Sequence, residues 1–180
     1  PIKVNTDPSL NASDLLLERV ALTPAHPIFS RQNPDGTWRN VTAQEFLDEV
    51  RSLAKGLIAQ GIKPGDAVAI MSRTRYEWTM IDFAIWFAGA VGVPIYESSS
   101  ASQIEWILSD SDAIALFIED DDHLERFNQV KSGTKRVKHV WRIDSKDFSG
   151  LHQDGEKIGD DQLEKARSNA TLSDLATIVY

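Results

Sequence analysis

Four short apolar runs alternate with longer stretches in which apolar residues recur at helical spacing. A short apolar run suits a strand that is buried on both faces, whereas apolar residues three and four positions apart suit a helix with one buried face. The strands are expected at residues 67–71, 91–96, 113–118 and 139–143. Strands that alternate with helices through short connections predict an α/β fold with a doubly wound, mostly parallel sheet and flanking helices.

Polar residues that can cap a helix precede several of the helical stretches. Serine and threonine hydroxyls accept hydrogen bonds from the free amides of a first turn, and a glutamate or glutamine three residues later completes a capping box. The expected caps are Thr42 with Glu45, Ser100 with Gln103, and Ser72 or Thr74. The expected helices lie at 15–20, between Thr42 and Gly61, at 76–88, between Ser100 and Leu108, at 121–130 and at 163–168.

The remaining segments are assigned from their turn residues and polarity. Residues 28–39 predict an N-terminal β-hairpin, because proline and glycine in the sequence NPDG favour a turn at 33–36. Residues 1–14 are interpreted as a flexible lead, and residues 145–161, rich in Asp, Gly and Ser, as a surface excursion. Residues 175–180 read as a final strand without a polar tail, which predicts a fragment of a longer chain.

Composition and charge narrow the function classes. The 180 residues carry a formal net charge of −8, and a surface of that sign repels the phosphate backbone of nucleic acids. The chain has no cysteine, which excludes disulfides and thiolate chemistry and suits a reducing, cytoplasmic location. The most apolar stretch, residues 78–95, contains Asp82 and two glycines, so we interpret it as a buried helix that leads into a strand and not as a transmembrane segment.

The candidate sites for chemistry have simpler structural explanations. The turns at 71–75 and 96–100 follow strands, where ligands commonly bind, but we interpret their serines as helix caps and their arginines as solvated. The acidic run at 119–122 lacks the spacing of a calcium loop and suits the start of a helix. A basic cluster is interpreted as a solvated loop: Lys131, Lys135, Arg136, Lys138 and His139.

Histidine and tryptophan residues also receive no functional assignment. The four histidines are expected in turns or at the edges of elements, without metal-ligand spacing; they are His26, His123, His139 and His152. Trp78, Trp86 and Trp106 fall within expected helices, so core packing is their default role. The sequence therefore assigns no catalytic, cofactor-binding or metal-binding residue.

Several segments, in order, resemble motifs of the adenylate-forming, AMP-binding enzymes. They read VTAQEF at 41–46, IKPGDAVAI at 62–70, AGAVGVPIY at 88–96, ILSDS at 107–111 and DLATIVY at 174–180. The last resembles the strand that leads into the family's ATP phosphate-binding loop. Two segments, SRTRYEW at 72–78 and PIYESSS at 94–100, are most similar to bacterial long-chain fatty acid–CoA ligases. The resemblance implies that residues 15–180 are an incomplete part of the large N-terminal domain, truncated before that loop.

The resemblance implies a two-step reaction for the full-length enzyme. A fatty acid carboxylate attacks ATP with Mg²⁺ to give acyl-AMP, and coenzyme A then displaces AMP. The family's catalytic residues would follow Tyr180, so the fragment is expected to be inactive and to bind no cofactor tightly. Some relatives hold the coenzyme A nucleotide near turns that correspond to Tyr96 through Ser100 and Glu119 through Arg126, but the acidic second turn departs from the arginines used there.

Two alternatives stay open from the sequence. The chain could be a self-contained flavodoxin-like module for a small ligand or for interaction, or the first part of a relative that activates aryl or amino acids. Peripheral membrane association also stays open. Because Leu175, Ile178 and Val179 would form an unpaired apolar edge, the fragment is expected to self-associate.

Overall fold

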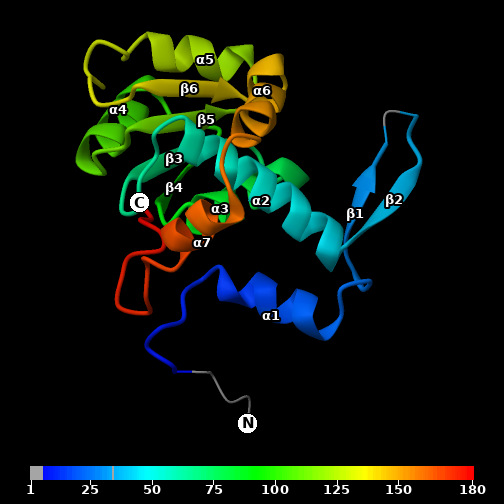
Figure 1. Cartoon of the computed structure of the whole chain (residues 1–180). Helices are drawn as coiled ribbons and strands as arrows, with labels where there is room; N and C mark the ends of the chain where they lie inside the picture. Colours follow the sequence, from blue (N-terminus) through cyan, green and yellow to red (C-terminus); the bar gives the residue numbers. More distant parts are fainter. Residues whose placement is uncertain (1–5, 34) are drawn as a thin grey trace.

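The computed structural model describes residues 6–33 and 35–180; the first part of the expected lead and Pro34 of the expected turn lie outside this range. A hairpin projects from a body in which helices enclose a sheet (Figure 1). The elements are α1 (Asp14–Leu22), β1 (Pro27–Gln32), β2 (Trp38–Thr42), α2 (Ala43–Ala59), β3 (Ala67–Met71), α3 (Tyr76–Phe87), β4 (Val91–Ile95), α4 (Ala101–Asp110), β5 (Ala115–Ile118), α5 (Asp121–Asn128), β6 (His139–Arg142), α6 (Lys146–Gly155) and α7 (Asp160–Arg167). The predicted hairpin is confirmed, with β1 antiparallel to β2.

The sheet has the strand order β4–β3–β5–β6, and all its neighbouring strands run parallel. The chain therefore crosses from β4, at one edge, over β3 to reach β5. At this change of direction the ends of β3 and β5 lie side by side, since Met71 pairs with Ile118. In doubly wound sheets such a switch point, at the carboxyl ends of the strands, is the usual place for a ligand.

Two apolar clusters lie on the two faces of the sheet. Val68, Ile70 and Phe117 face a core that α2, α3 and α6 complete. Met71 and Leu116 face a second core completed by α4 and α5. All five residues of β3 are buried, as expected for a strand covered on both sides. The prediction of a doubly wound α/β fold is confirmed.

The two predicted capping boxes are confirmed, and the third predicted cap is wrong. Thr42 with Glu45 starts α2, and Ser100 with Gln103 starts α4. Helix α3 starts instead at Arg75, which makes no side-chain cap hydrogen bond. The predicted cap fails because the Ser72 hydroxyl donates to the Arg73 carbonyl oxygen at 2.9 Å.

The predicted surface excursion at 145–161 is wrong, because most of it forms α6. This helix begins at Ser145, whose hydroxyl accepts from the amide of Asp147, and it buries Leu151 against α2. The two helices approach closely at glycines. A β-carbon at Gly56 would lie 2.2 Å from the Leu151 carbonyl oxygen, and one at Gly155 would lie 2.7 Å from the Gly56 nitrogen.

The predicted final strand is also wrong as a regular element. The terminal segment, which we define as residues 174–180, makes one parallel bridge, from Thr177 to Gly92 on the outer edge of β4. Its Leu175 and Val179 side chains are 66% and 75% exposed. The apolar pattern indicated a strand, but a strand needs a run of paired residues, and a single bridge does not provide one.

Two predictions about aromatic and imidazole side chains also need correction. Trp106 is 58% exposed and packs edge-on against Tyr180 at a centroid distance of 5.0 Å, so it is not a core residue. His123 lies inside α5 and is buried, and His152 lies inside α6.

None of the helices in residues 6–33 and 35–180 is long and apolar enough to cross a membrane.

The close contact of α2 and α6 predicts opposite effects for two glycine substitutions. Gly56→Ala should lower the free energy of unfolding by about 1–3 kcal/mol, because the added methyl overlaps the backbone of α6. Gly150→Ala, in α6 with open space around it, should raise it by about 0.5–1 kcal/mol through helix propensity. Urea unfolding measures both values. Equal effects of the two substitutions would contradict the close contact.

Candidate functional site

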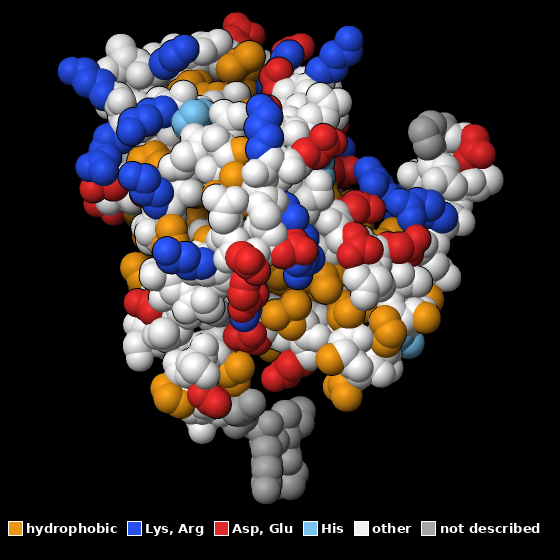
Figure 2. Space-filling model, in the orientation of Figure 1, with side chains coloured by type: hydrophobic (Ala, Val, Ile, Leu, Met, Phe, Trp, Pro, Cys, Tyr) orange, Lys and Arg blue, Asp and Glu red, His pale blue; other side chains and the backbone are white. Residues whose placement is uncertain are grey.

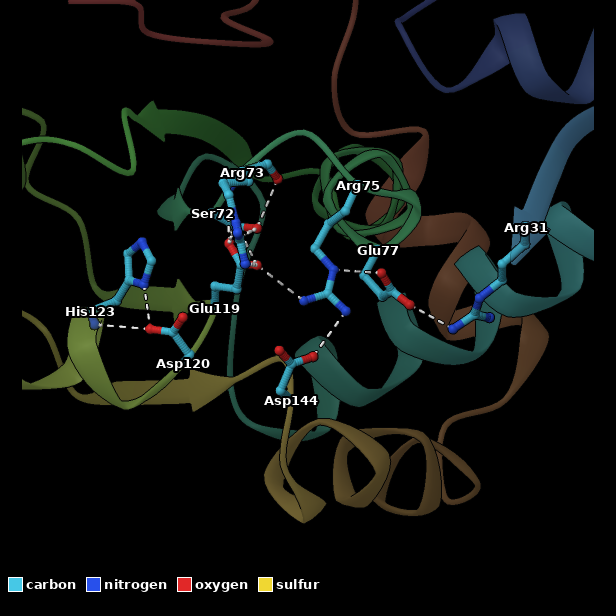
Figure 3. A network of polar contacts seen from close by, with 9 residues as sticks. All are labelled: Arg31, Ser72, Arg73, Arg75, Glu77, Glu119, Asp120, His123 and Asp144. Carbon is cyan, nitrogen blue, oxygen red and sulfur yellow. Dashed lines mark hydrogen bonds and ion pairs between the residues drawn. The ribbon is translucent and has the colours of Figure 1, made fainter. Parts of the chain in front are cut away.

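The candidate site lies where β3, β5 and β6 end at one edge of the sheet. Met71 pairs with Ile118, and Ile118 pairs with Arg142, so the three strands finish level with one another. The loops that follow carry charged side chains toward one another, as Figure 3 shows. Those side chains come from the turn before α3, the turn before α5, the turn before α6 and the hairpin. The switch point of the sheet is thus filled by residues of the chain itself.

Glu119 is the buried centre of this network, with 3% of its surface exposed. Its Oε2 accepts from the Arg73 amide at 2.9 Å, and its Oε1 accepts from Arg73 Nη2 at 2.6 Å. The Ser72 hydroxyl lies 3.4 Å from Oε2, and Arg75 Nη1 lies 3.5 Å from Oε1. The Arg73 hydrogen bonds hold the pKa of Glu119 below its usual value, so this carboxylate stays ionised near neutral pH.

Arg75 extends the network toward α6 and the hairpin. Its Nε donates to Glu77 at 2.7 Å, and its Nη2 lies 2.9 Å from the Asp144 carboxylate. Glu77 in turn accepts from Arg31 of β1, whose guanidinium also lies 4.7 Å from the centre of the Tyr76 ring. Burial acts to lower the pKa of Arg75, but its hydrogen bonds with Asp144 and Glu77 outweigh burial and raise it.

Asp120 and His123 form a pair at the start of α5. Asp120 caps the helix through the His123 amide and also lies 2.6 Å from His123 Nδ1. The side-chain hydrogen bond holds the pKa of Asp120 below its usual value. Since an ionised carboxylate only accepts, Nδ1 carries the proton in this contact. His123 Nε2 is buried and has no hydrogen-bond partner within residues 6–33 and 35–180.

The structure resolves several of the sequence-based interpretations. Asp120, Asp121 and Asp122 form the acidic start of a helix, as predicted. The prediction that the arginines of the turn at 71–75 are solvated is confirmed for Arg73, whose side chain is 68% exposed although it binds Glu119. It is wrong for Arg75, which is partly buried and lies 2.9 Å from the Asp144 carboxylate. Sequence spacing gave no signal for these pairs, since 46 residues separate Arg73 from Glu119.

The two turns that begin at Tyr96 and Glu119 lie next to each other in the fold. Arg126 on α5 donates to the Ser99 carbonyl oxygen at 2.9 Å and so joins the two turns. Tyr96 points outward and is largely exposed. No group of three or more histidine or acidic side chains that could hold a metal ion occurs within the described residues.

Chemically, the carboxylates and arginines of the network hold backbone segments in place. Its carboxylates Glu119, Glu77 and Asp144 each contact an arginine. A general acid or base needs a pKa near the working pH. The hydrogen bonds of Glu119 with Arg73 and of Asp120 with His123 hold the pKa values of both carboxyls below their usual values. The part of the site that faces solvent is the guanidinium of Arg73, which Glu119 fixes in place.

A profile of the AMP-binding enzyme family matches residues 16–180. The chain belongs to the AMP-binding enzyme family. It is 36% identical over 173 residues to the long-chain-fatty-acid–CoA ligase FadD15 of Mycobacterium bovis, and 35% identical to that of Mycobacterium tuberculosis. Each match covers 94% of this chain and 29% of the relative, so the chain spans less than a third of their length.

Solved structures of AMP-binding enzymes show the same fold. A long-chain-fatty-acid–CoA ligase from Archaeoglobus fulgidus matches with a TM-score of 0.75 and 22% identity, over 96% of this chain and 34% of that one. A putative long-chain-fatty-acid CoA ligase from Rhodopseudomonas palustris matches with a TM-score of 0.68 and 25% identity, over 79% of this chain and 36% of that one. The match to the N-terminal region of the family agrees with the order of motifs along this chain.

The network predicts a specific effect of neutralising Glu119. Glu119→Gln should lower the free energy of unfolding at pH 7 by about 1–3 kcal/mol, because the amide group would face the Arg73 donors with a donor of its own. Urea unfolding measures this, and Glu125→Gln, on the exposed side of α5, should change stability by less than about 0.5 kcal/mol.

The same pair predicts a dependence on pH. Because the folded state lowers the pKa of Glu119, its contribution is present above the unfolded carboxyl pKa of about 4.3 and is lost as pH falls through the lower folded value. The stability difference between the wild type and Glu119→Gln should therefore shrink below about pH 4. A difference that is constant from pH 7 to pH 3 would contradict the assignment.

Proposed function

We propose that this chain is the first part of the adenylating domain of an ATP-dependent long-chain fatty acid–CoA ligase. The observation that carries the proposal is the identity of 35–36% over 94% of the chain to the mycobacterial long-chain-fatty-acid–CoA ligases. The proposed reaction joins a fatty acid carboxylate to AMP with release of pyrophosphate and then transfers the acyl group to coenzyme A. A cytoplasmic location is part of this proposal.

In this proposal the described residues act as a scaffold. The Glu119 network holds the turns before α3, α5 and α6 in fixed positions at the carboxyl edge of the sheet. The described residues offer no cluster of acidic side chains for Mg²⁺, so no step is assigned to them through the metal. The proposed reaction uses ATP, Mg²⁺ and coenzyme A, which we assign to the longer enzyme as its cofactors and substrates.

A chimeric enzyme tests the proposal. The matched region of the Mycobacterium tuberculosis FadD15 ligase is replaced by residues 6–180 of this chain, and pyrophosphate release is measured with palmitate, ATP and Mg²⁺, followed by acyl-CoA formation. We expect the rate to stay within roughly ten-fold of the parent enzyme, a loss of no more than about 1.4 kcal/mol. A folded chimera that activates no fatty acid would overturn the proposal.

The choice of acid is tested with the same chimera. Long-chain fatty acids should be activated in preference to benzoate, anthranilate and amino acids. The 22% identity to the anthranilate CoA ligase structure supports only a common fold, so it does not favour an aromatic acid. A preference for aromatic or amino acids would favour the relatives that activate those acids.

The 180-residue chain by itself should release no pyrophosphate with ATP, Mg²⁺ and palmitate. The reason is that the resemblance assigns the ATP phosphate-binding loop to residues after Tyr180. The assay is run beside the intact mycobacterial ligase as a positive control. Turnover by the 180-residue chain would contradict this scaffold role.

The 180-residue chain is also expected to self-associate. The outer edge of the terminal segment carries exposed apolar side chains at Leu175 and Val179, and such an edge pairs readily with another copy. Light scattering should detect dimers or larger species, and Val179→Lys should reduce them. Leu22→Lys removes an equally exposed leucine on α1 and should leave association unchanged. A monomeric wild type at high concentration would count against this prediction.

A further inference from the structure

Strand β6 is one edge of the parallel sheet, and its outer side has no partner strand within residues 6–33 and 35–180. On its inner side it pairs with β5, where the Lys138 amide donates to the Ile114 carbonyl oxygen at 2.8 Å. Successive residues of a strand direct their backbone groups to opposite sides, so those of His139 and Trp141 face away from β5. Neither residue makes a backbone hydrogen bond to another segment in the part of the chain that the structure describes.

The side chains of β6 also indicate an open edge. His139, Val140 and Arg142 are only partly buried, whereas every residue of β3 and β5 is buried. At the opposite edge of the sheet, the amide and carbonyl groups of Gly92 in β4 are bonded to the terminal segment. The outer backbone groups of β6 are therefore available to a strand from another molecule.

The residues that lead into β6 and form it are basic. Residues 129–143 contain five lysines and arginines and no aspartate or glutamate, in a chain whose net charge is −8. The two arginines each contact an aspartate. Lys131, Lys135 and Lys138 are exposed, as the interpretation of a solvated loop predicted, and no ion pair of theirs is found within residues 6–33 and 35–180. In Figure 2, basic side chains predominate where Figure 1 places β6 and the loop before it.

These two features together favour one class of partner. No large apolar side chain of residues 129–143 is exposed, so this surface has nothing to insert into a membrane. A nucleic acid brings phosphates but no amides and carbonyls in the spacing of a strand, and the rest of this acidic chain repels it. An extended peptide with acidic side chains supplies both a backbone for the open edge and carboxylates for the lysines.

We propose that β6 binds an extended acidic segment of a partner protein as an additional strand of the sheet. Side chains alternate along a strand, so Lys138, Val140 and Arg142 lie on one face of the sheet. The added strand places acidic side chains beside Lys138 and Arg142 and a β-branched side chain beside Val140. This interaction surface lies apart from the Glu119 network and does not depend on the proposed ligase activity.

The lysines also determine which strands the edge rejects. A second copy of β6 would bring the same positive charge to the interface, and like charges on paired strands are destabilising. The charge at Lys135 and Lys138 therefore disfavours pairing between two copies at this edge and selects a partner of opposite charge.

Binding of a synthetic peptide to the 180-residue chain tests the proposal. The probe is a capped peptide of the sequence Asp-Glu-Thr-Val-Thr-Glu-Asp, whose two glutamates have the same spacing as Lys138 and Arg142. We expect saturable binding that weakens about ten-fold or more when the salt concentration rises from about 0.05 M to about 0.5 M. In NMR spectra, the amide signals of His139 and Trp141 should shift, and their hydrogen exchange should slow.

Two changes to the peptide separate charge from strand pairing. Replacement of its acidic residues by asparagine and glutamine should weaken binding about ten-fold or more. N-methylation of every second amide blocks one side of a strand, and the two possible sets of methyl groups block opposite sides. One methylated peptide should therefore lose binding, and the other should keep it.

Two variants of the chain test the same surface from the other side. Lys135→Glu with Lys138→Glu should weaken binding of the acidic peptide about ten-fold or more. Lys63→Glu with Lys157→Glu changes the same charge at exposed lysines elsewhere and should alter binding by less than about two-fold.

The chimera with the mycobacterial ligase shows whether the edge of β6 stays open in a longer enzyme, and we expect it to bind the peptide as the 180-residue chain does. Absence of peptide binding to the chimera, equal binding of both methylated peptides, or binding to phosphatidylglycerol vesicles without binding to the peptide would each rule out the added strand. None of these measurements uses adenylation, so their outcome is independent of the proposed ligase function.

Discussion

The buried Glu119 carboxylate is the interaction on which the carboxyl edge of the sheet depends. An ionised carboxylate away from water is costly unless it is paired and hydrogen-bonded. Arg73 supplies both a guanidinium and a backbone amide, so satisfying Glu119 also fixes the turn before α3. Arg75 then connects the same carboxylate to Asp144 before α6 and to Glu77 in α3. The Glu119 carboxylate thus holds together loops from separate parts of the chain.

This arrangement supports the proposed role of the switch point of the sheet as a scaffold. At the ends of β3 and β5, where many doubly wound proteins hold a ligand, this chain places the ion pair of Glu119 and Arg73. Asp82 on α3 is the opposite case. It is partly buried, and burial raises its pKa where arginine lowers that of Glu119. In Figure 2, basic side chains predominate toward the upper left of the viewed face and acidic side chains toward its lower part.

The elements predicted correctly are those whose signal is local. Strand β3 was predicted with its observed limits, because five consecutive apolar residues suit a strand covered on both faces. The capping boxes at Thr42 and Ser100 were predicted because both partners lie within one helical turn. Helix α6 was missed because its segment is polar and contains glycines. Its stability comes from the close approach of Gly155 and Leu151 to α2, which lies about 100 residues earlier, as the 100-residue separation of Ser52 and His152 also shows.

The sequence by itself determined the fold class, the order of the parallel-sheet elements along the chain and the hairpin, because apolar periodicity and turn residues act over a few positions. The family was identified separately, from the resemblance of several segments to its motifs. Only the tertiary structure decided the strand order in space, and with it the partners of the charged side chains. Glu119 and Arg73 meet because β5 lies beside β3. The energy of a charge depends on what surrounds it in three dimensions, and that is set by the packing of distant segments.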